Sequence, residues 1–371
     1  MILVILLLCI LGVLMLSQAL IQRFGYKNLT YELSFSEKEV FEGDTVTLTE
    51  TICSRKPLPL PWVKAELTTQ SALLFASKQS TVSEDTRFVS SYFTLLPYRR
   101  IERHWNVTCT QRGMYTVSHA VIVLSDLFGA PELSRPMPEA HAELTVLPAR
   151  RHTSVPEAFP QQLMGDVIRR RMLIPDRIAV SGIRPYADGD PVRDICWSAS
   201  ARTEQPMVRQ FQETASPTAA ILLNMQTRET DRDTASDRPA LENCIRLCAA
   251  CINAAAQMRI PVRFCANTTV NGAAAETPFR SGNDALYPVL RLLAALPATV
   301  SGRCESMIKA VRQQNSNAAI ILITVQPTEA LIQLADRDPA LTVISLKPLR
   351  DREIRPNIRH INLIQERMIS S

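Results

Sequence analysis

Hydrophobic and polar residues alternate along the first part of the chain. Tyr31, Leu33 and Phe35 alternate with polar residues, and a similar alternation continues through 46–50. A period of two is typical of a strand with one buried face. Further strand-like runs occupy 62–69, 88–95, 104–110, 115–124 and 142–147, separated by turn signals. Many short strands with no helical period between them predict a β-sandwich domain over 29–148.

The hydrophobic pattern changes in the last part of the chain. Apolar runs at 219–223 and 318–325 are continuous, as expected of strands buried on both faces. Apolar residues at helical spacing mark helices near 241–255, 286–296, 306–313 and 328–335, and shorter strand-like runs lie at 262–266 and 341–346. Strands that alternate with helices predict a doubly wound α/β domain over 215–371. The predicted fold class is therefore α+β multidomain.

The N-terminal stretch is apolar throughout. Residues 1–21 are interrupted only by Ser17 and Gln18, and about twenty such residues suffice to cross a bilayer as a helix. We therefore predict a transmembrane helix over 1–22. The first basic residues, Arg23 and Lys27, follow this helix, which predicts a single-pass protein of the cell membrane with its bulk in the cytoplasm. A secretory signal peptide is the alternative, but the basic stretch that normally precedes its apolar part is missing from the sequence.

Composition narrows the functional classes. The net charge of +5 is modest and only 6% of the 371 residues are aromatic, so nucleic-acid binding receives no support. The nine cysteines follow no spacing framework, which favours free thiols in a reducing compartment. The sequence contains no HExxH, GxSxG, GxGxxG or Walker A motif. We expect no enzyme activity, no cofactor and no small-molecule substrate.

The densest cluster of informative residues lies at 182–202, within a basic linker and signature segment assigned to 149–214. Gly189 suits a turn that needs a positive φ. Asp190 before Pro191 is a helix-start signal, and it predicts a short helix over 191–202 that the Asp190 carboxylate caps. A metal site built from Asp188, Asp190 and Asp194 is an alternative, but capping together with an internal aspartate–arginine network is preferred.

The predicted helix would place Arg193, Trp197 and Ala201 on one face, where an arginine–tryptophan contact is allowed. We expect Trp197 to be buried, so that its removal would destabilise the fold. The candidate positions of this segment, structural or partner-contacting, are Arg184, Tyr186, Gly189, Asp190, Arg193, Trp197, Ala201 and Arg202.

This segment resembles the hallmark of a bacterial and archaeal family known as domain of unknown function 58. Arg112-Gly113-Met114-Tyr115, Ser125-Asp126-Leu127-Phe128-Gly129 and Val208-Arg209-Gln210-Phe211 resemble three further elements of that family, in the same order. One departure is Cys196, which stands where the family commonly has aspartate. The resemblance implies an association with a MoxR-type AAA ATPase and a von Willebrand factor A-like domain after the signature.

Domains of that type hold a divalent metal through an Asp-x-Ser-x-Ser loop after the first strand. In this chain the corresponding loop is 224–228, where Asn224 and Gln226 replace the aspartate and the first serine. A magnesium site without a carboxylate would bind poorly. We therefore expect a degenerate metal loop and no bound metal.

Two functional hypotheses remain open. The first is a non-enzymatic, membrane-tethered interaction or assembly factor, attached through its N-terminal helix and working with a MoxR-type ATPase as protein partner. The second is an extracytoplasmic adhesion or cell-envelope protein, which would require the opposite membrane topology.

Overall fold

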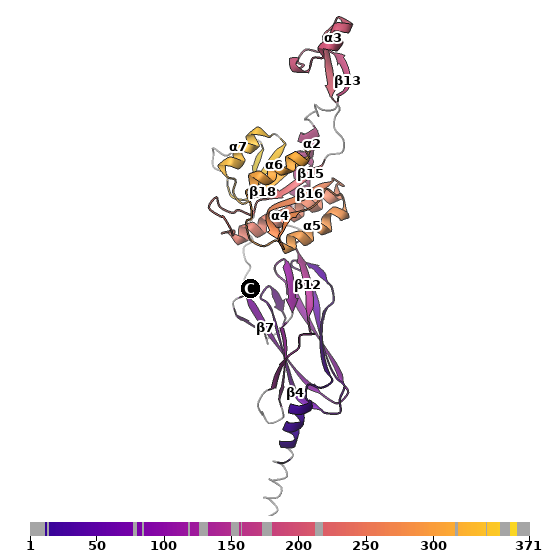
Figure 1. Cartoon of the computed structure of the whole chain (residues 1–371), viewed down its shortest axis with the longest axis vertical. Coiled ribbons are helices and arrows are strands. Elements are labelled where there is room, and N and C mark those ends of the chain that lie inside the picture. The colour runs from indigo at the N-terminus through magenta and orange to yellow at the C-terminus, as the bar shows by residue number, and fades with distance from the viewer. Residues whose placement is uncertain are drawn as a thin grey trace, which may run out of the picture. The chain divides into compact units, whose positions relative to one another are not determined.

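The computed structural model describes residue 12 and residues 15–76, 80–83, 85–117, 119–125, 133–149, 156, 158–172, 180–211, 218–315, 318–338, 340–348 and 357–361. It is a mixed α+β structure with many strands in several sheets (Figure 1). The chain divides into two compact units, residues 1–149 and 150–371. Each unit is described by itself below.

The first unit is built from strands and is called the β-domain here. Its strands are β1 (Leu29–Phe35), β2 (Glu39–Phe41), β3 (Thr45–Ser54), β4 (Leu60–Gln70), β5 (Leu73–Phe75), β6 (Ser80–Ser83), β7 (Thr86–Leu95), β8 (Arg100–Cys109), β9 (Gly113–Val117), β10 (His119–Ser125), β11 (Leu133–Pro136) and β12 (Ala142–Leu147). They form sheets of order β1-β3-β8-β5, β11-β10-β4-β7-β6 and β2-β12-β9. The runs expected from the alternating pattern form strands, except that the run 115–124 forms two, β9 and β10, which belong to different sheets.

One apolar core joins these sheets. It contains Leu48 and Ile52 of β3 together with Leu67 of β4 and Val89 of β7, all fully buried. Alternate residues of β3 are buried, as a strand with one core-facing side requires. Because the core draws on strands from the four-stranded and the five-stranded sheets, these two sheets face each other across it.

The N-terminal end of this unit is helical over residues 15–24, drawn in indigo in Figure 1. Most of the predicted transmembrane segment, residues 1–11, 13 and 14, lies outside the described residues. Within the described ranges, no helix has both the length and the apolar character that crossing a membrane requires.

The second unit contains a six-stranded sheet. Its strands are β15 (Ala219–Leu223), β16 (Val262–Val270), β17 (Ala273–Glu276), β18 (Ala319–Thr324), β19 (Leu341–Ser345) and β20 (Ile358–His360), in the spatial order β17-β16-β15-β18-β19-β20. All neighbours are parallel except β17, which pairs with β16 as an antiparallel edge hairpin. The strand order reverses between β15 and β18, and ligands of open α/β sheets bind at the carboxyl ends of strands beside such a reversal.

Helices cover this sheet on both faces, so the predicted doubly wound arrangement is present. The helices are α2 (Ala158–Met172), α4 (Arg238–Gln257), α5 (Asn283–Ala295), α6 (Cys304–Gln314) and α7 (Glu329–Arg337). The core on one face combines Ala220 and Leu222 of β15 with Ile308 of α6 and Leu331 of α7. Helix α4 contacts β15, β16 and β18, and it also contacts α2 and α5. Helix α2 falls within the predicted linker, and its Leu163 and Met164 are fully buried.

The signature segment forms a small module of its own. Strands β13 (Val180–Pro185) and β14 (Met207–Phe211) pair antiparallel, and between them lie a 3₁₀ turn, η1 (Val192–Asp194), and helix α3 (Trp197–Thr203). Residues 180–211 are called the signature module below. The segments that flank it, 173–179 and 212–217, lie outside the described residues.

Candidate functional site

Polar side chains gather where β15, β16 and β18 end, beside the reversal of strand order. Asn224 follows β15, Asn267 lies near the end of β16, and Thr324 is the last residue of β18. All three are at most 6% exposed. Because the carboxyl ends of parallel strands meet at one edge of a sheet, side chains separated by up to a hundred residues in the sequence come together here.

Hydrogen bonds link these three side chains to one another. The amide nitrogen of Asn224 donates to Thr324 Oγ1 at 3.2 Å, and that of Asn267 donates to Asn224 Oδ1 at 3.1 Å. Asn224 Oδ1 also accepts from the backbone N–H of Gln226 at 3.2 Å, while Asn267 Oδ1 accepts from that of Met225 at 2.7 Å. The carboxamide of Asn224 therefore fixes the start of the loop that follows β15.

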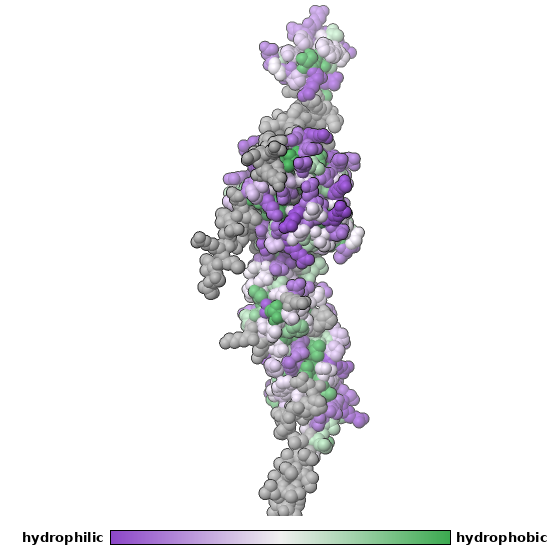
Figure 2. Space-filling model, turned by 90° about the vertical axis from the view of Figure 1, so that its left-hand side faces the viewer, coloured by the Kyte–Doolittle hydropathy of each residue, from purple (hydrophilic) through white to green (hydrophobic). Residues whose placement is uncertain are grey.

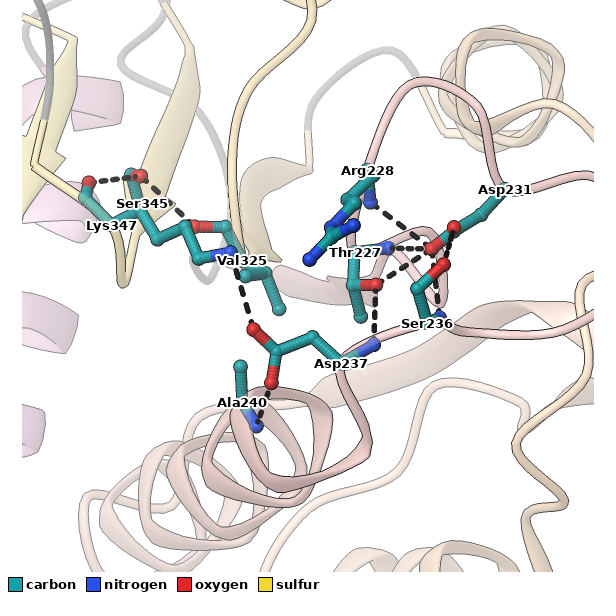
Figure 3. Close-up of polar contacts among 9 residues, drawn as sticks. All are labelled: Thr227, Arg228, Asp231, Ser236, Asp237, Ala240, Val325, Ser345 and Lys347. Atoms are coloured by element: carbon teal, nitrogen blue, oxygen red, sulfur yellow. Dashed lines mark hydrogen bonds and ion pairs between the residues drawn. The ribbon is translucent and has the colours of Figure 1, made fainter.

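A second cluster in the same loop surrounds Asp231 (Figure 3). Asp231 Oδ2 accepts from the N–H and the hydroxyl of Thr227 at 3.0 and 2.6 Å, and from the N–H groups of Arg228 and Ser236 at 3.1 and 3.2 Å. Asp231 Oδ1 accepts from the Ser236 hydroxyl. Burial works to raise the pKa of Asp231, but the hydrogen bonds from Ser236 and Thr227 outweigh it and hold this pKa well below its usual range. The carboxylate therefore stays ionised while it fastens the loop.

Asp237 connects this loop to helix α4. Its backbone N–H donates to Thr227 Oγ1 at 3.1 Å, and its carboxylate caps the helix by accepting from Ala240 N at 3.2 Å (Figure 3). Lys347, which follows β19, places its ammonium 3.2 Å from the Asp237 carboxylate. Burial by itself would raise the pKa of Asp237. The hydrogen bond from the Ala240 N–H and the charge of Lys347 outweigh this effect, so the pKa of Asp237 is lower than usual. The loop, the start of α4 and the end of β19 are thereby tied together.

The donor chemistry of this edge does not fit a divalent cation. Both oxygens of Asp231 accept hydrogen bonds from N–H or O–H groups, whereas a cation needs free oxygen lone pairs directed at it. Asn224 uses both polar atoms of its carboxamide inside the cluster. In the described part of the chain, no group of three or more His, Cys, Asp and Glu residues could hold a metal ion. That Asn224 and Gln226 form a degenerate metal loop stays a prediction.

Millimolar Mg²⁺ or Mn²⁺ is therefore expected to give no saturable heat when titrated into the purified chain, and no rise in its melting temperature. Isothermal titration calorimetry and a thermal melt measure the two quantities. A saturable signal that disappears in Asp231→Ala would show that this loop holds a metal after all.

The signature module is organised by an ion pair, which confirms the aspartate–arginine network that the sequence analysis preferred. Arg184 and Asp190 form a bidentate pair, with Nη1–Oδ2 and Nη2–Oδ1 both at 2.7 Å. Asp190 Oδ2 also accepts from the backbone N–H of Ala187 at 2.9 Å. The prediction that Asp190 caps a helix is wrong, because its oxygens hold this turn closed and η1 has no side-chain cap. The predicted turn at Gly189 is confirmed, with φ +102°.

The helix expected over 191–202 is split in two. Residues Val192–Asp194 form only a 3₁₀ turn, and α3 starts at Trp197 after the extended residue Ile195, which forms an isolated bridge with Val208. Arg193 therefore does not share a continuous helix face with Trp197. The expected burial of Trp197 is also wrong, since its exposed fraction is 70%.

The other signature positions lie at the surface of the module or partly within it. Tyr186 is half-buried and its N–H donates to Pro206 O at 2.8 Å, whereas Arg193, Ala201 and Arg202 are exposed. In Figure 2 the module has a hydrophobic green patch among hydrophilic residues.

Cys196, which departs from the family pattern, is buried just before α3. The hydrogen bond with Ser198 (Sγ–Oγ 3.4 Å), then the Ala199 N–H and Arg209, lower the pKa of this thiol to about 7. With a pKa near 7, part of the thiol population is ionised at neutral pH.

Sequence analysis missed Asp231, Ser236, Asn267 and Thr324. The run Asp237-Arg238-Pro239 is a helix-start signal that could have placed the beginning of α4 and drawn attention to the loop before it. The polar residues after the apolar runs of β16 and β18 were a second signal, because such positions meet at the sheet edge.

A family comparison covers the part of the chain that contains both clusters. Residues 182–347 match the family model described as "Protein of unknown function DUF58". These residues are similar to that family. The matched part, called the DUF58 domain below for this similarity, runs from Gly182 of the signature module through the α/β sheet as far as Lys347, so the resemblance noted at 182–202 is supported.

Other comparisons add little. No curated protein matches the chain. Solved structures that align with it include a CARDB domain from Pyrococcus furiosus (13% identity, 33% of this chain and 97% of that chain, TM-score 0.23) and a cohesin from Archaeoglobus fulgidus (10%, 32% and 91%, TM-score 0.23). Spo0M, a sporulation control protein from Bacillus subtilis, aligns at 14% identity over 43% of this chain and 58% of its own, with a TM-score of 0.20. TM-scores of this size carry no argument about fold or function.

Proposed function

We propose that this chain is a non-enzymatic interaction protein, attached to a membrane by residues 1–22, whose DUF58 domain binds a protein partner. The observation that carries the proposal is the state of the loop after β15. At the sheet edge where α/β domains commonly bind ligands, the polar atoms of Asp231 and Asn224 make hydrogen bonds that hold the loop in place. A loop fixed in this way offers a preformed surface to a macromolecule.

The partner proposed here is a MoxR-type AAA ATPase, and the α/β sheet is proposed to be von Willebrand factor A-like. Both follow from the family resemblance of the signature. The strand order of the sheet, with β15 and β18 central and an antiparallel edge at β17, is compatible with such a domain.

The signature module supplies a contact surface that suits this role. Trp197 is 70% exposed and Val192 is 66% exposed, although both are apolar. The bidentate Arg184–Asp190 pair fixes the turn that leads into η1. Tryptophan is among the residues that contribute most to protein interfaces, because its large side chain loses little entropy when a partner covers it.

Trp197→Ala is expected to leave the melting temperature of the chain unchanged and to weaken partner binding at least about tenfold, the size typical of an interface tryptophan. Crosslinking in native membranes followed by mass spectrometry identifies the partner, and a binding titration with the purified pair measures the loss. Tyr287→Ala, which removes an exposed aromatic side chain from α5, serves as the matched control. A melting temperature lowered by Trp197→Ala, with partner binding intact, would make this residue structural.

Membrane attachment and topology are open to a direct test. Of the described cysteines, seven are buried and Cys53 is half-buried, so the native thiols suit labelling poorly. Met114→Cys adds a thiol at a position that is 62% exposed. In intact cells an impermeant thiol reagent should fail to label this variant if the bulk of the chain is cytoplasmic. Labelling there would favour the extracytoplasmic adhesion or envelope protein.

A further inference from the structure

Three chain segments meet at the end of the β-domain from which the N-terminal helix departs. Arg55 N donates to Asn28 O at 2.9 Å, Ser54 N donates to Arg99 O at 2.9 Å, and Tyr98 N donates to Lys56 O at 3.3 Å. These bonds place residues 23–28, 53–58 and 96–100 side by side. Their exposed side chains are called the basic end below: Arg23, Phe24, Lys27, Arg55, Leu96, Tyr98, Arg99 and Arg100.

The basic end carries charge of one sign. The three segments contain six basic residues and no acidic one. Five of the six are exposed, and Arg100 pairs with Glu102 on β8, whose carboxylate lies 2.6 Å away. A surface of this charge attracts anionic groups over about a Debye length.

Large apolar side chains project among these charges. Tyr98 is 68% exposed, Leu96 is 56% exposed, and Phe24 is 37% exposed. Lys27 and Arg23 lie over the Phe24 ring, at 5.0 and 6.0 Å from its centroid. Tyr98 has φ +53°, a left-handed backbone conformation that aromatic residues rarely adopt, and the fold therefore maintains a strained turn that presents this side chain to the outside.

The end of the helix is fixed to this surface. Lys56 is only 5% exposed, and its ammonium donates to Phe24 O at 3.1 Å and to Gly25 O, the carbonyls at the helix C-terminus. Burial lowers the pKa of Lys56 to about 8, which leaves it charged at neutral pH. A Cβ on Gly25 would clash with Ile21 O and come within 2.8 Å of Leu124 Cδ1. The helix end and the basic end therefore keep one relative position.

We infer that the basic end is a membrane-facing surface, on which Arg and Lys side chains contact anionic lipid headgroups while Tyr98, Leu96 and Phe24 enter the interfacial region. The inference rests on the proposed membrane attachment. Residues 1–21 form an apolar sequence that runs directly into the basic end, so a bilayer that held them would lie against it. Aromatic side chains at the headgroup level, flanked by basic residues, are the composition that bilayer interfaces favour.

The membrane contact of the basic end can be tested with the variant Tyr98→Trp in the full-length chain. The variant is reconstituted into vesicles of phosphatidylglycerol and phosphatidylcholine with brominated acyl chains. Interfacial side chains enter the headgroup–acyl boundary by about 5–10 Å, so bromine should remove roughly half or more of the added fluorescence. Met114→Trp is the matched control. Met114 is exposed and follows Cys109, which ends β8 at the opposite end from Arg100. The ten residues of β8 span about 30 Å, so position 114 lies far from the basic end. Both variants keep the three native tryptophans, so their difference reports the added one.

Each outcome bears on the proposal. The expected result is quenching at position 98 but not at position 114. This quenching should be reduced when Arg55→Gln and Arg99→Gln are combined, or when phosphatidylglycerol is omitted. If the chain floats with the vesicles and position 98 stays unquenched, the basic end faces something else, such as a protein, and this inference fails alone. If the chain does not float with vesicles at all, membrane attachment fails and this inference with it, while partner binding by the DUF58 domain is unaffected.

Discussion

Replacing Glu50 with alanine is expected to lower the free energy of unfolding of the β-domain by about 3–5 kcal/mol. Glu50 lies on β3, is fully buried, and accepts hydrogen bonds from Tyr31 Oη at 2.5 Å, Ser91 Oγ at 2.7 Å and Trp105 Nε1 at 3.0 Å. Ser91 belongs to the opposite sheet, so the carboxylate joins the two sheets through the core. Alanine leaves three buried donors without their acceptor, and each such loss costs about 1–3 kcal/mol.

Denaturant unfolding followed by tryptophan fluorescence measures this effect. Glu50→Gln should lose less, because its carbonyl oxygen can still accept from Ser91 and Trp105 while its amide group faces the Tyr31 oxygen. Burial, and then the Glu50 charge, raise the pKa of Tyr31 well above its usual value, so its hydroxyl keeps the proton that it donates. Glu66→Ala, at a partly exposed ion pair with Lys64 on β4, is the control and should cost at most about 1 kcal/mol. Equal losses in Glu50→Ala and Glu66→Ala would contradict the role assigned to Glu50.

The second large effect is expected at Asp231. Asp231→Ala removes the acceptor of five hydrogen bonds from Thr227, Arg228 and Ser236, and it should destabilise the α/β unit by about 3 kcal/mol or more. Asp233→Ala, two residues further along the same loop, replaces an exposed side chain and should change stability by less than about 0.5 kcal/mol.

The same residue makes stability depend on pH. The pKa of Asp231 is lower in the folded chain than the value of about 3.9 in an unfolded chain. Its contribution is therefore complete above pH ~4 and is lost as the pH falls through the folded pKa. Melting temperatures measured from pH 7 down to pH 3 should fall more steeply below pH ~4 in the parent chain than in Asp231→Ala. Parallel curves would show that this carboxylate is not held as described.

The hydrophobic pattern predicted most long strands and helices of the two units, but it did not predict α2 or the partners of the buried polar residues. Continuous apolar runs identified β15 and β18 because both faces of these strands are buried. The alternating pattern placed Glu50 on the same face of β3 as Val46 and Leu48. It could not identify the hydrogen-bond donors of Glu50, because Ser91 reaches it only when the two sheets pack together.

Local competition explains the errors in the signature module. Asp190 before Pro191 satisfied a helix-cap pattern, but Arg184, six residues earlier, offers a charged bidentate partner once the turn at Gly189 closes. Periodicity placed Trp197 on a helix face and could not say whether anything covers that face. Asp231 was overlooked because its partners at 227 and 236 meet it only when the loop is closed.

The fixed connection at Lys56 has a mechanical consequence. Its ammonium joins the carbonyls of Phe24 and Gly25 to the strand connection after β3, and the Tyr26 hydroxyl donates to Ile122 O at 2.9 Å and to Leu133 O on the other sheet. Residues 24–26 are therefore fixed to the β-domain at two points, and a movement of the β-domain is expected to carry helical residues 15–24 with it.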